Sequence, residues 1–215
     1  VLSPQVLHAG NYGVPESRER VIFIGIRKDA LKEEIAQILK NDLIPNHLNP
    51  YPQPTHNCTL NDETLATPVV LCDVLKQLKE PKESFDPSQR FYSKAKYMGA
   101  HCQGQKEITM NSIGPTIRSE HHGNIEYRRL SLEHGGTNKN ELEKGLAERR
   151  LTPRECALIQ TFPPDFQFVI PKDYDWKRFI VSASGAYKVI GNAVPPILAY
   201  HIAMRIQNLW STYFK

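Results

Sequence analysis

Two arginines separated by one residue, Arg18 and Arg20, are the first side chains in this sequence whose type and spacing could do chemistry. They lie between a predicted turn at Asn11-Tyr12-Gly13 and a predicted strand, and strand alternation is expected to send both to the same face of a sheet. Guanidinium groups are rigid, permanently charged donors, so the pair suits a phosphate or the carbonyl oxygen of a base. An ion pair with Glu16 or Glu19 on a solvated edge is the structural alternative.

A second candidate lies near the end of the chain, where residues 191–196 read Gly-Asn-Ala-Val-Pro-Pro. The segment offers a flexible glycine and the side-chain amide of Asn192 just before a helix that is predicted to begin at Pro195 or Pro196. On chemistry alone, a ligand-contacting loop and a tight loop that caps a core helix fit this pattern equally well.

A third set of candidates is rich in cations, amides and glycines and lies between residues 94 and 124. Gln and Asn can read adenine with two hydrogen bonds, Arg and Lys can read guanine, and glycines let a backbone approach a groove. A polar, solvent-exposed loop is the alternative for any single residue. The candidate DNA-contacting residues are Gln103, Gln105, Lys106, Arg118, Ser119, His121, His122 and Asn124.

The charge of the chain is informative in its distribution more than in its total. The formal net charge of +4 is too mild to identify a nucleic-acid partner. Between Ser88 and Arg129, however, seven Lys or Arg stand against three acids, which makes this region the best candidate for a phosphate-facing surface. The seven cations are Arg90, Lys94, Lys96, Lys106, Arg118, Arg128 and Arg129.

The cysteines and the hydropathy pattern exclude several classes of protein. The four cysteines form no C-x-x-C pair, so neither a zinc site nor a disulfide framework is predicted. No apolar run approaches the roughly 20 residues that span a bilayer, so no membrane partner is expected. A reducing cytoplasm suits this composition.

The elements that must position the N-terminal candidates are two strands and a helix. The apolar run Val21–Ile26 is typical of a strand covered on both faces of an α/β sheet. Val1-Leu2 and Val6-Leu7 predict its partner strand. Helical spacing then predicts a helix over Leu31–Lys40 with Asp29 as its cap.

The rest of the chain predicts a linker, an irregular unit and two helices. Residues 41–54 carry four prolines and predict a linker, and the weakly periodic stretch after it predicts a helix near Val70–Leu78. Thr152-Pro153-Arg154-Glu155 is a capping box that should begin a helix ending at Phe162. The helix after Pro196 carries one apolar stripe that should dock on the N-terminal strands. The stripe consists of Leu198, Ile202, Ile206 and Leu209.

Taken in order, three of these segments resemble the C-terminal half of a DNA cytosine-5 methyltransferase. The segment from Tyr12 to Arg20 looks like the family's Gln-x-Arg-x-Arg motif, with Glu16 standing where Gln is usual. Residues 151–163 resemble the motif that buttresses the family's recognition domain, and residues 191–196 resemble the last family motif. The family's Pro-Cys nucleophile and its Gly-rich cofactor loop do not occur in this sequence.

The second segment departs from the family at two positions. The family's motif usually ends Gln-Gly-Phe-Pro, and here Thr161 replaces the glycine, while Leu158 stands where Arg is frequent. Cys102-Gln103 is similar to the nucleophilic Pro-Cys-Gln, but His101 precedes it and it follows the arginine motif instead of preceding it. Cys102 is therefore not expected to be the nucleophile.

The resemblance implies roles for several of these residues. It assigns contact with a flipped target cytosine to Arg20, with Arg18 as its neighbour. It places Asn192 and Ala193 at the S-adenosylmethionine pocket, most of which lies in the absent half. The stretch between the motifs becomes a target recognition domain that binds double-stranded DNA.

The fold that the resemblance implies is α/β, with edge strands and the final helix of a Rossmann-like methyltransferase sheet plus an irregular, strand-containing target recognition domain. Residues 1–45 would supply the strands and helix of the catalytic domain, and residues 46–186 the recognition domain. Residues 187–215 would form the cofactor-side loop and the returning helix. The chain begins at a Val that already reads as the middle of a fold, so a fragment or one piece of a larger enzyme is expected.

The predicted function is that of the C-terminal portion of a DNA cytosine-5 methyltransferase in a bacterial restriction-modification setting, in the cytoplasm. The N-terminal catalytic half would be its partner, in the same parent chain or as a separate subunit. Because the Pro-Cys nucleophile is missing, the chain alone is predicted to be inactive. A non-catalytic, sequence-specific DNA-binding subunit or inactive fragment is the rival, and an unrelated α/β protein with chance motifs is a third possibility.

Overall fold

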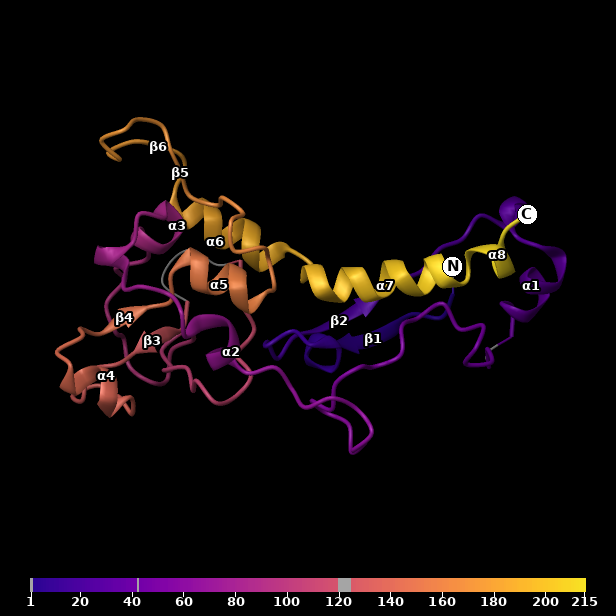
Figure 1. Cartoon of the computed structure of the whole chain (residues 1–215), viewed down its shortest axis with the longest axis horizontal. Helices are drawn as coiled ribbons and strands as arrows, with labels where there is room; N and C mark the ends of the chain where they lie inside the picture. Colours follow the sequence, from indigo (N-terminus) through magenta and orange to yellow (C-terminus); the bar gives the residue numbers. More distant parts are fainter. Residues whose placement is uncertain (1, 42, 120–124) are drawn as a thin grey trace.

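A computed structural model describes residues 2–41, 43–119 and 125–215. Figure 1 shows an elongated molecule in which one long helix, α7 (Pro196–Asn208), runs from a helical body toward the end that holds both termini. The body contains the elements from α2 to α6, and we call it the recognition body (residues 71–192) after the role that the sequence predicts for most of this region. The described residues combine helices with three small antiparallel sheets, so the mixed α/β class is confirmed in its coarse form.

The sheet that carries the N-terminal candidates has only two strands in the described part of the chain. Strands β1 (Gln5–His8) and β2 (Glu19–Ile22) pair antiparallel, with Val6 opposite Val21. Between them, the short helix η1 (Ala9–Tyr12) ends at Gly13, whose φ of 83° confirms the predicted turn.

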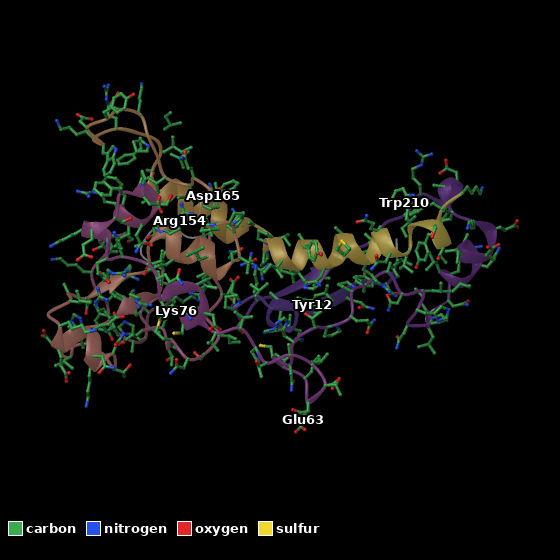
Figure 2. All side chains as sticks on the ribbon, in the orientation of Figure 1. Tyr12, Glu63, Lys76, Arg154, Asp165 and Trp210 are labelled. Atoms are coloured by element: carbon green, nitrogen blue, oxygen red, sulfur yellow. The ribbon has the colours of Figure 1, made fainter. Side chains whose placement is uncertain are left out.

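Helix α7 covers one face of this sheet, as the sequence predicted. Its Leu198 is fully buried in a cluster with residues of β1, η1 and the segment after β2. That cluster consists of Leu2, Leu7, Ala9, Tyr12, Val14, Ile24, Tyr51 and Leu198. Figure 2 shows Tyr12 at the middle of the molecule beneath α7, where its ring lies 5.7 Å from that of His201.

The other face of the sheet is open, which corrects the prediction of a strand covered on both faces. Val6, Val21 and Phe23 are 62%, 53% and 67% exposed. These apolar side chains therefore lie on a face of the β1–β2 sheet that no element in the described part of the chain covers.

The far end of the molecule holds η2 (Lys28–Ala30), α1 (Glu33–Ile38) and α8 (Trp210–Tyr213). Helix α1 is shorter than the predicted 31–40, and Asp29 does not cap it. Asp29 lies in η2, three residues before the N-cap Lys32, and its carboxylate binds Arg27 with an Nη2 to Oδ2 distance of 2.5 Å. Figure 2 shows Trp210 at this end, where it is 61% exposed.

The recognition body surrounds the largest apolar core of the chain. Its elements are α2 (Leu71–Leu75), η3 (Pro81–Glu83), α3 (Pro87–Arg90), β3 (Tyr127–Arg129), α4 (Lys139–Glu143), β4 (Arg149–Arg150), α5 (Pro153–Ile159), β5 (Ile170–Pro171), β6 (Phe179–Val181) and α6 (Ala183–Asn192). Strand β3 pairs with β4 and β5 with β6. The helix predicted near residues 70–78 is confirmed as α2, whereas α6 was not predicted.

Helix α5 begins at the predicted capping box. The Thr152 Oγ1 accepts from the Glu155 backbone N at 3.0 Å, and Glu155 Oε2 accepts from the Thr152 N at 2.8 Å. The helix ends at Ile159, three residues before the predicted Phe162, and Thr161 then adopts a left-handed φ of 68°. A non-glycine residue is strained there, and this is the position at which the resembling motif has Gly.

No helix in the described ranges has both the length and the apolar character that crossing a membrane requires.

The capping box gives a stability prediction. Thr152→Ala removes the acceptor for the Glu155 amide and the bond from Thr152 Oγ1 to Gln89, so we expect the free energy of unfolding to fall by about 1–2 kcal/mol. Thr152→Ser keeps the hydroxyl and serves as the control. Chemical denaturation of both variants checks this, and equal losses in the two would contradict the assignment.

Candidate functional site

The guanidinium of Arg18 joins three segments that are far apart in the sequence. Arg18 is 2% exposed. Its Nη1 donates to the Ile117 carbonyl at 2.9 Å, and its Nη2 donates to the carbonyls of Gly191 at 2.8 Å and Ala193 at 2.9 Å. The first and last of the three motifs therefore meet at one side chain, together with the recognition body. We call this contact the Arg18 junction (Glu16, Arg18, Ile117, Gly191 and Ala193).

Glu16 completes the junction from the same segment. Its Oε1 accepts from the Ile117 backbone N at 2.6 Å and lies 3.4 Å from Arg18 Nη1. Burial raises the pKa of Glu16 to about 7, although the charge of Arg18 opposes that rise. Near neutral pH, a fraction of the Glu16 carboxyl groups is therefore protonated and uncharged. A glutamine at this position would be uncharged at every pH.

Gly191 is required by packing and not by flexibility. The sequence predicted a flexible glycine before a helix, but Gly191 lies inside α6. A β-carbon at this position would lie 2.2 Å from the backbone carbonyl of Arg118 and 2.3 Å from the Ser119 N. The backbone at Arg118 and Ser119 can approach α6 this closely only because the side chain of Gly191 is a hydrogen.

The second arginine has a different environment from the first. Arg20 is exposed, and its Nη1 donates to the Glu19 carbonyl at 2.6 Å. The two guanidiniums therefore do not act as a matched pair on one open face, because Arg18 precedes β2 and is enclosed by the junction. The exposed arginine borders an open hollow lined by His8, Ser17, Glu19, Arg20, Thr59 and Thr116.

The other motif residues at the junction are partly accessible. Asn192 is exposed at the end of α6, and Ala193 is half-buried with its carbonyl on Arg18. Val194 follows with 49% exposure. An amide and an apolar side chain are thus presented next to the junction, where they could form one wall of a ligand pocket.

The predicted DNA-contacting residues of the first loop have different environments. Gln103 and Lys106 are exposed. Gln105 is 2% exposed, and its Oε1 accepts from the Met98 backbone N at 2.9 Å. The amide of Gln105 thus stabilises its own loop, unlike the exposed base-reading amide that the sequence suggested.

The second loop is described only in part. Arg118 is about one-third exposed and lies 3.8 Å from Glu126, and Ser119 is half-buried. Both adjoin the backbone that packs on Gly191. The candidates His121, His122 and Asn124 lie outside the described residues.

Two cations of the predicted phosphate-facing region lie in the interior. Arg128 and Arg129 are buried, and both bind Glu141. Arg129 also binds Glu80 at 2.6 Å. Because their charge is matched by carboxylates, they stabilise the body and do not face solvent, whereas Arg90, Lys94, Lys96 and Lys106 are exposed.

Arg150 is a structural centre that the sequence analysis missed. It is 1% exposed, and its plane lies 4.2 Å from the centroid of the Tyr127 ring. Its guanidinium donates to four backbone carbonyls, those of Ala95, Lys96, Gly104 and Ile125. One side chain therefore fixes both loops that carry the DNA-contacting candidates. A pair of arginines, separated from the capping box only by Leu151, was the available signal.

Its neighbour Arg149 faces carboxylates instead. The Arg149 Nη1 binds Glu155 at 2.8 Å, and its Nε binds Glu80 at 2.9 Å. Arg149 thereby ties the start of α5 to the network around Arg129.

The cysteines of the described residues do not form a reactive or metal-binding centre with one another. Cys156 is fully buried, and burial raises the pKa of its thiol. Cys102 is half-buried with its Sγ 3.9 Å from the Met98 carbonyl. Within the described ranges, no three His, Cys, Asp or Glu side chains gather in a way that could hold a metal ion.

Comparison with known proteins gives a consistent result. The sequence profile of the C-5 cytosine-specific DNA methylase family matches residues 1–208. The chain is 32% identical to the Type II methyltransferase M.BspRI of Lysinibacillus sphaericus, over 98% of this chain and 44% of that protein. It is 30% identical to M.BsuRI of Bacillus subtilis, over 98% of this chain and 43% of that protein, and 27% identical to M.FnuDI of Fusobacterium nucleatum, over 95% and 54%. The chain spans about half the length of these relatives.

The buried carboxyl of Glu16 predicts a pH dependence of stability. Because its pKa is raised in the folded chain to about 7, from 4.5, its contribution is fully present below about pH 4.5 and is lost as the pH rises through 7. Glu16→Gln removes that loss, so the variant should gain stability over wild type across this window, by about 3 kcal/mol at most. Thermal or chemical unfolding of both proteins from acid to neutral pH checks it. Parallel curves would rule out the raised pKa.

Proposed function

Because the chain belongs to the C-5 cytosine-specific DNA methylase family, we propose that it is the C-terminal portion of a DNA cytosine-5 methyltransferase of a restriction-modification system. The complete enzyme would transfer a methyl group from S-adenosylmethionine to C5 of a cytosine that is flipped out of a specific DNA sequence. The observation that carries this proposal is the Arg18 junction, where the arginine motif, the Gly-Asn-Ala-Val segment and the recognition body meet in contacts of 2.8–2.9 Å.

In the proposed reaction, a cysteine thiolate forms a bond to C6 of the cytosine and electron density moves to C5. S-adenosylmethionine would supply the methyl group that C5 takes up and would leave as S-adenosylhomocysteine. C5 then loses its proton and the sulfur–C6 bond breaks. Charge gathers on the base during this sequence, and donors placed before the reaction lower the barrier most effectively.

The residues of this chain would position and polarise the base. Arg20 is exposed beside an open hollow and can aim its free donors at the carbonyl oxygen of a flipped cytosine. Arg18 would act indirectly, since its donors are occupied by backbone carbonyls that fix the segment before Arg20. Asn192, Ala193 and Val194 fit one wall of the S-adenosylmethionine site.

The cysteine-bearing N-terminal half would bind at the open face of the β1–β2 sheet. A two-stranded sheet is marginal alone, and an exposed strand edge invites pairing. The exposed Val6, Val21 and Phe23 supply the apolar surface that such a partner would bury. We propose that this half is part of the same parent chain or a separate subunit, and that the whole acts in the cytoplasm.

A second candidate function is that of a non-catalytic, sequence-specific DNA-binding subunit. The observation that favours it is that no cysteine in this sequence follows a proline, as the family's nucleophile does. In that case, the recognition body would bind DNA, and this chain would take no part in methyl transfer.

Transfer of labelled methyl from S-adenosylmethionine to DNA separates the two candidates. We expect no transfer by this chain alone or by the cysteine-bearing half alone, and transfer by the mixture. Activity of the chain alone would mean that Cys102 has to be reconsidered as the nucleophile. Inactivity of the mixture, with both parts shown to be folded, would favour the DNA-binding subunit.

Arg20→Ala in the complete enzyme should lower kcat by about 100- to 1,000-fold, because it removes a donor to the developing charge, while DNA affinity changes little. Arg27→Ala is the matched control, since Arg27 is an exposed arginine at the far end of the molecule, paired with Asp29. Single-turnover methylation and DNA-binding measurements check both variants. Wild-type turnover in Arg20→Ala would refute the role of this residue.

A further inference from the structure

The segment that leaves α3, residues 90–97, presents a row of cations on one side. Phe91 has the extended dihedrals φ −104° and ψ 123°. From Ser93 onward, exposed and half-buried residues alternate, with Lys94 and Lys96 exposed. Arg90, the last residue of α3, is also exposed and directly precedes this extended segment, in which alternation places Tyr92 on the side of the two lysines. We call Arg90, Tyr92, Lys94 and Lys96 the cationic row.

The residues between the members of the row fix the segment to the recognition body. The Phe91 ring packs edge-on against Phe179 at 4.8 Å, and the Ser93 backbone N donates to the Tyr187 hydroxyl at 3.2 Å. The Ala95 carbonyl accepts from Arg150 Nε at 3.2 Å, and Tyr97 stacks on His134 at 4.3 Å. Every second side chain or its backbone is therefore anchored, so the row is rigid although it belongs to no sheet.

The charges of the row are not neutralised by carboxylates. Within the described ranges, no Asp or Glu oxygen lies within 4.0 Å of the charged nitrogens of Arg90, Lys94 or Lys96. The Lys94 Nζ lies 3.3 Å from the centroid of the Tyr92 ring, and the Arg90 guanidinium lies 5.1 Å from that of Trp176. Aromatic rings thus hold two of the cations in place. Arg90 Nη1 also donates to the Ser84 carbonyl at 3.4 Å, and the other donors of the two cations make no hydrogen bond to protein within the described residues.

Nearby acids are already engaged with other cations. Asp173 and Asp175 lie just before Trp176 in the sequence. Asp173 binds Arg178 at 2.7 Å, and Asp175 binds Lys177 at 3.3 Å. Asp86, at the start of α3, binds Arg154 at 2.5 Å. These three carboxylates are therefore paired with cations outside the row.

The backbone of the row adds donors of the same kind. Among the described residues, the amides of Tyr92, Lys94 and Lys96 donate to no protein acceptor. Cations and backbone amides are the groups that contact phosphate oxygens in nucleic-acid complexes. Residues two apart in an extended segment are about 6.6 Å apart, which is of the order of the separation between neighbouring phosphates of one strand.

We propose that the cationic row binds the phosphates of one DNA strand next to the base-reading loops. The inference rests on the proposed function and extends it to a site that would strengthen binding to DNA without distinguishing one base sequence from another. The location is argued from Arg150, which binds the carbonyls of Lys96 and Gly104 at once and so places the row beside the loop of Gln103 and Lys106. The row would set the register of the duplex, and the loops would read it.

The salt dependence of DNA binding tests this proposal. Each lost phosphate contact lowers the slope of log K against log salt by about 0.9, so the triple variant Arg90→Gln, Lys94→Gln, Lys96→Gln should lose about 2.7 from that slope. We expect its preference between two duplexes of different sequence to stay unchanged. Binding of this chain to a duplex of fixed sequence is measured from about 50 to 200 mM NaCl.

Two further variants make the result specific. The first is a control triple variant, Lys28→Gln, Lys139→Gln, Lys144→Gln. It removes three exposed lysines outside the row and should keep the wild-type slope. The second is a triple variant that keeps the three positive charges, Arg90→Lys, Lys94→Arg, Lys96→Arg. It should also keep the wild-type slope. An unchanged slope in the Gln triple variant, with wild-type binding intact, overturns the row and leaves the proposed function standing. If wild type binds no DNA even when it is mixed with the cysteine-bearing half, the proposed function and the row both fail.

Discussion

The buried guanidinium of Arg18 is the contact on which the arrangement of the molecule depends. A charge taken out of water is costly unless its donors find acceptors, and Arg18 finds three backbone carbonyls and one carboxylate. The three carbonyls belong to the recognition body and to the turn into α7, and the carboxylate is that of Glu16 in the segment of Arg18 itself. The energetic demand of one side chain therefore fixes the relation between the sheet and the body. The exposed Arg20 is held two residues further on, at the edge of that fixed frame.

Inside the recognition body, neighbouring arginines divide two tasks. Arg149 binds Glu80 and Glu155 and thereby secures the start of α5, whereas Arg150 binds carbonyls of loops with little regular structure. Such loops lack the ladders that satisfy backbone groups in sheets, and a guanidinium with five donors can substitute for them. This explains how a body with very short strands can hold polar loops in a defined position.

Local patterns were predictable from the sequence, whereas distant partners were not. The capping box at Thr152, the turn at Gly13 and the start of α7 depend on residues within a few positions, and all three are confirmed. The burial of Arg18 depends on carbonyls 99 to 175 residues away, which strand alternation cannot reveal. Arg129 was assigned to the surface because charge alone suggests exposure, and its partner Glu80 lies 49 residues away. Asp29 failed as a cap because α1 begins at Glu33, with Lys32 as its N-cap, and Asp29 lies in the preceding turn η2.

The contact between Gly191 and the backbone of Arg118 has a consequence for protein engineering. Recognition segments are attractive units for exchange between related enzymes, because specificity would travel with them. Here the incoming segment must reproduce the main-chain path at Ile117 and Arg118. At Gly191 of α6 there is room only for a hydrogen atom beside the Arg118 backbone, and Arg18 must find the Ile117 carbonyl in its place. The workable boundaries of a chimaera therefore lie outside residues 117–191, so that both sides of this contact come from the same parent.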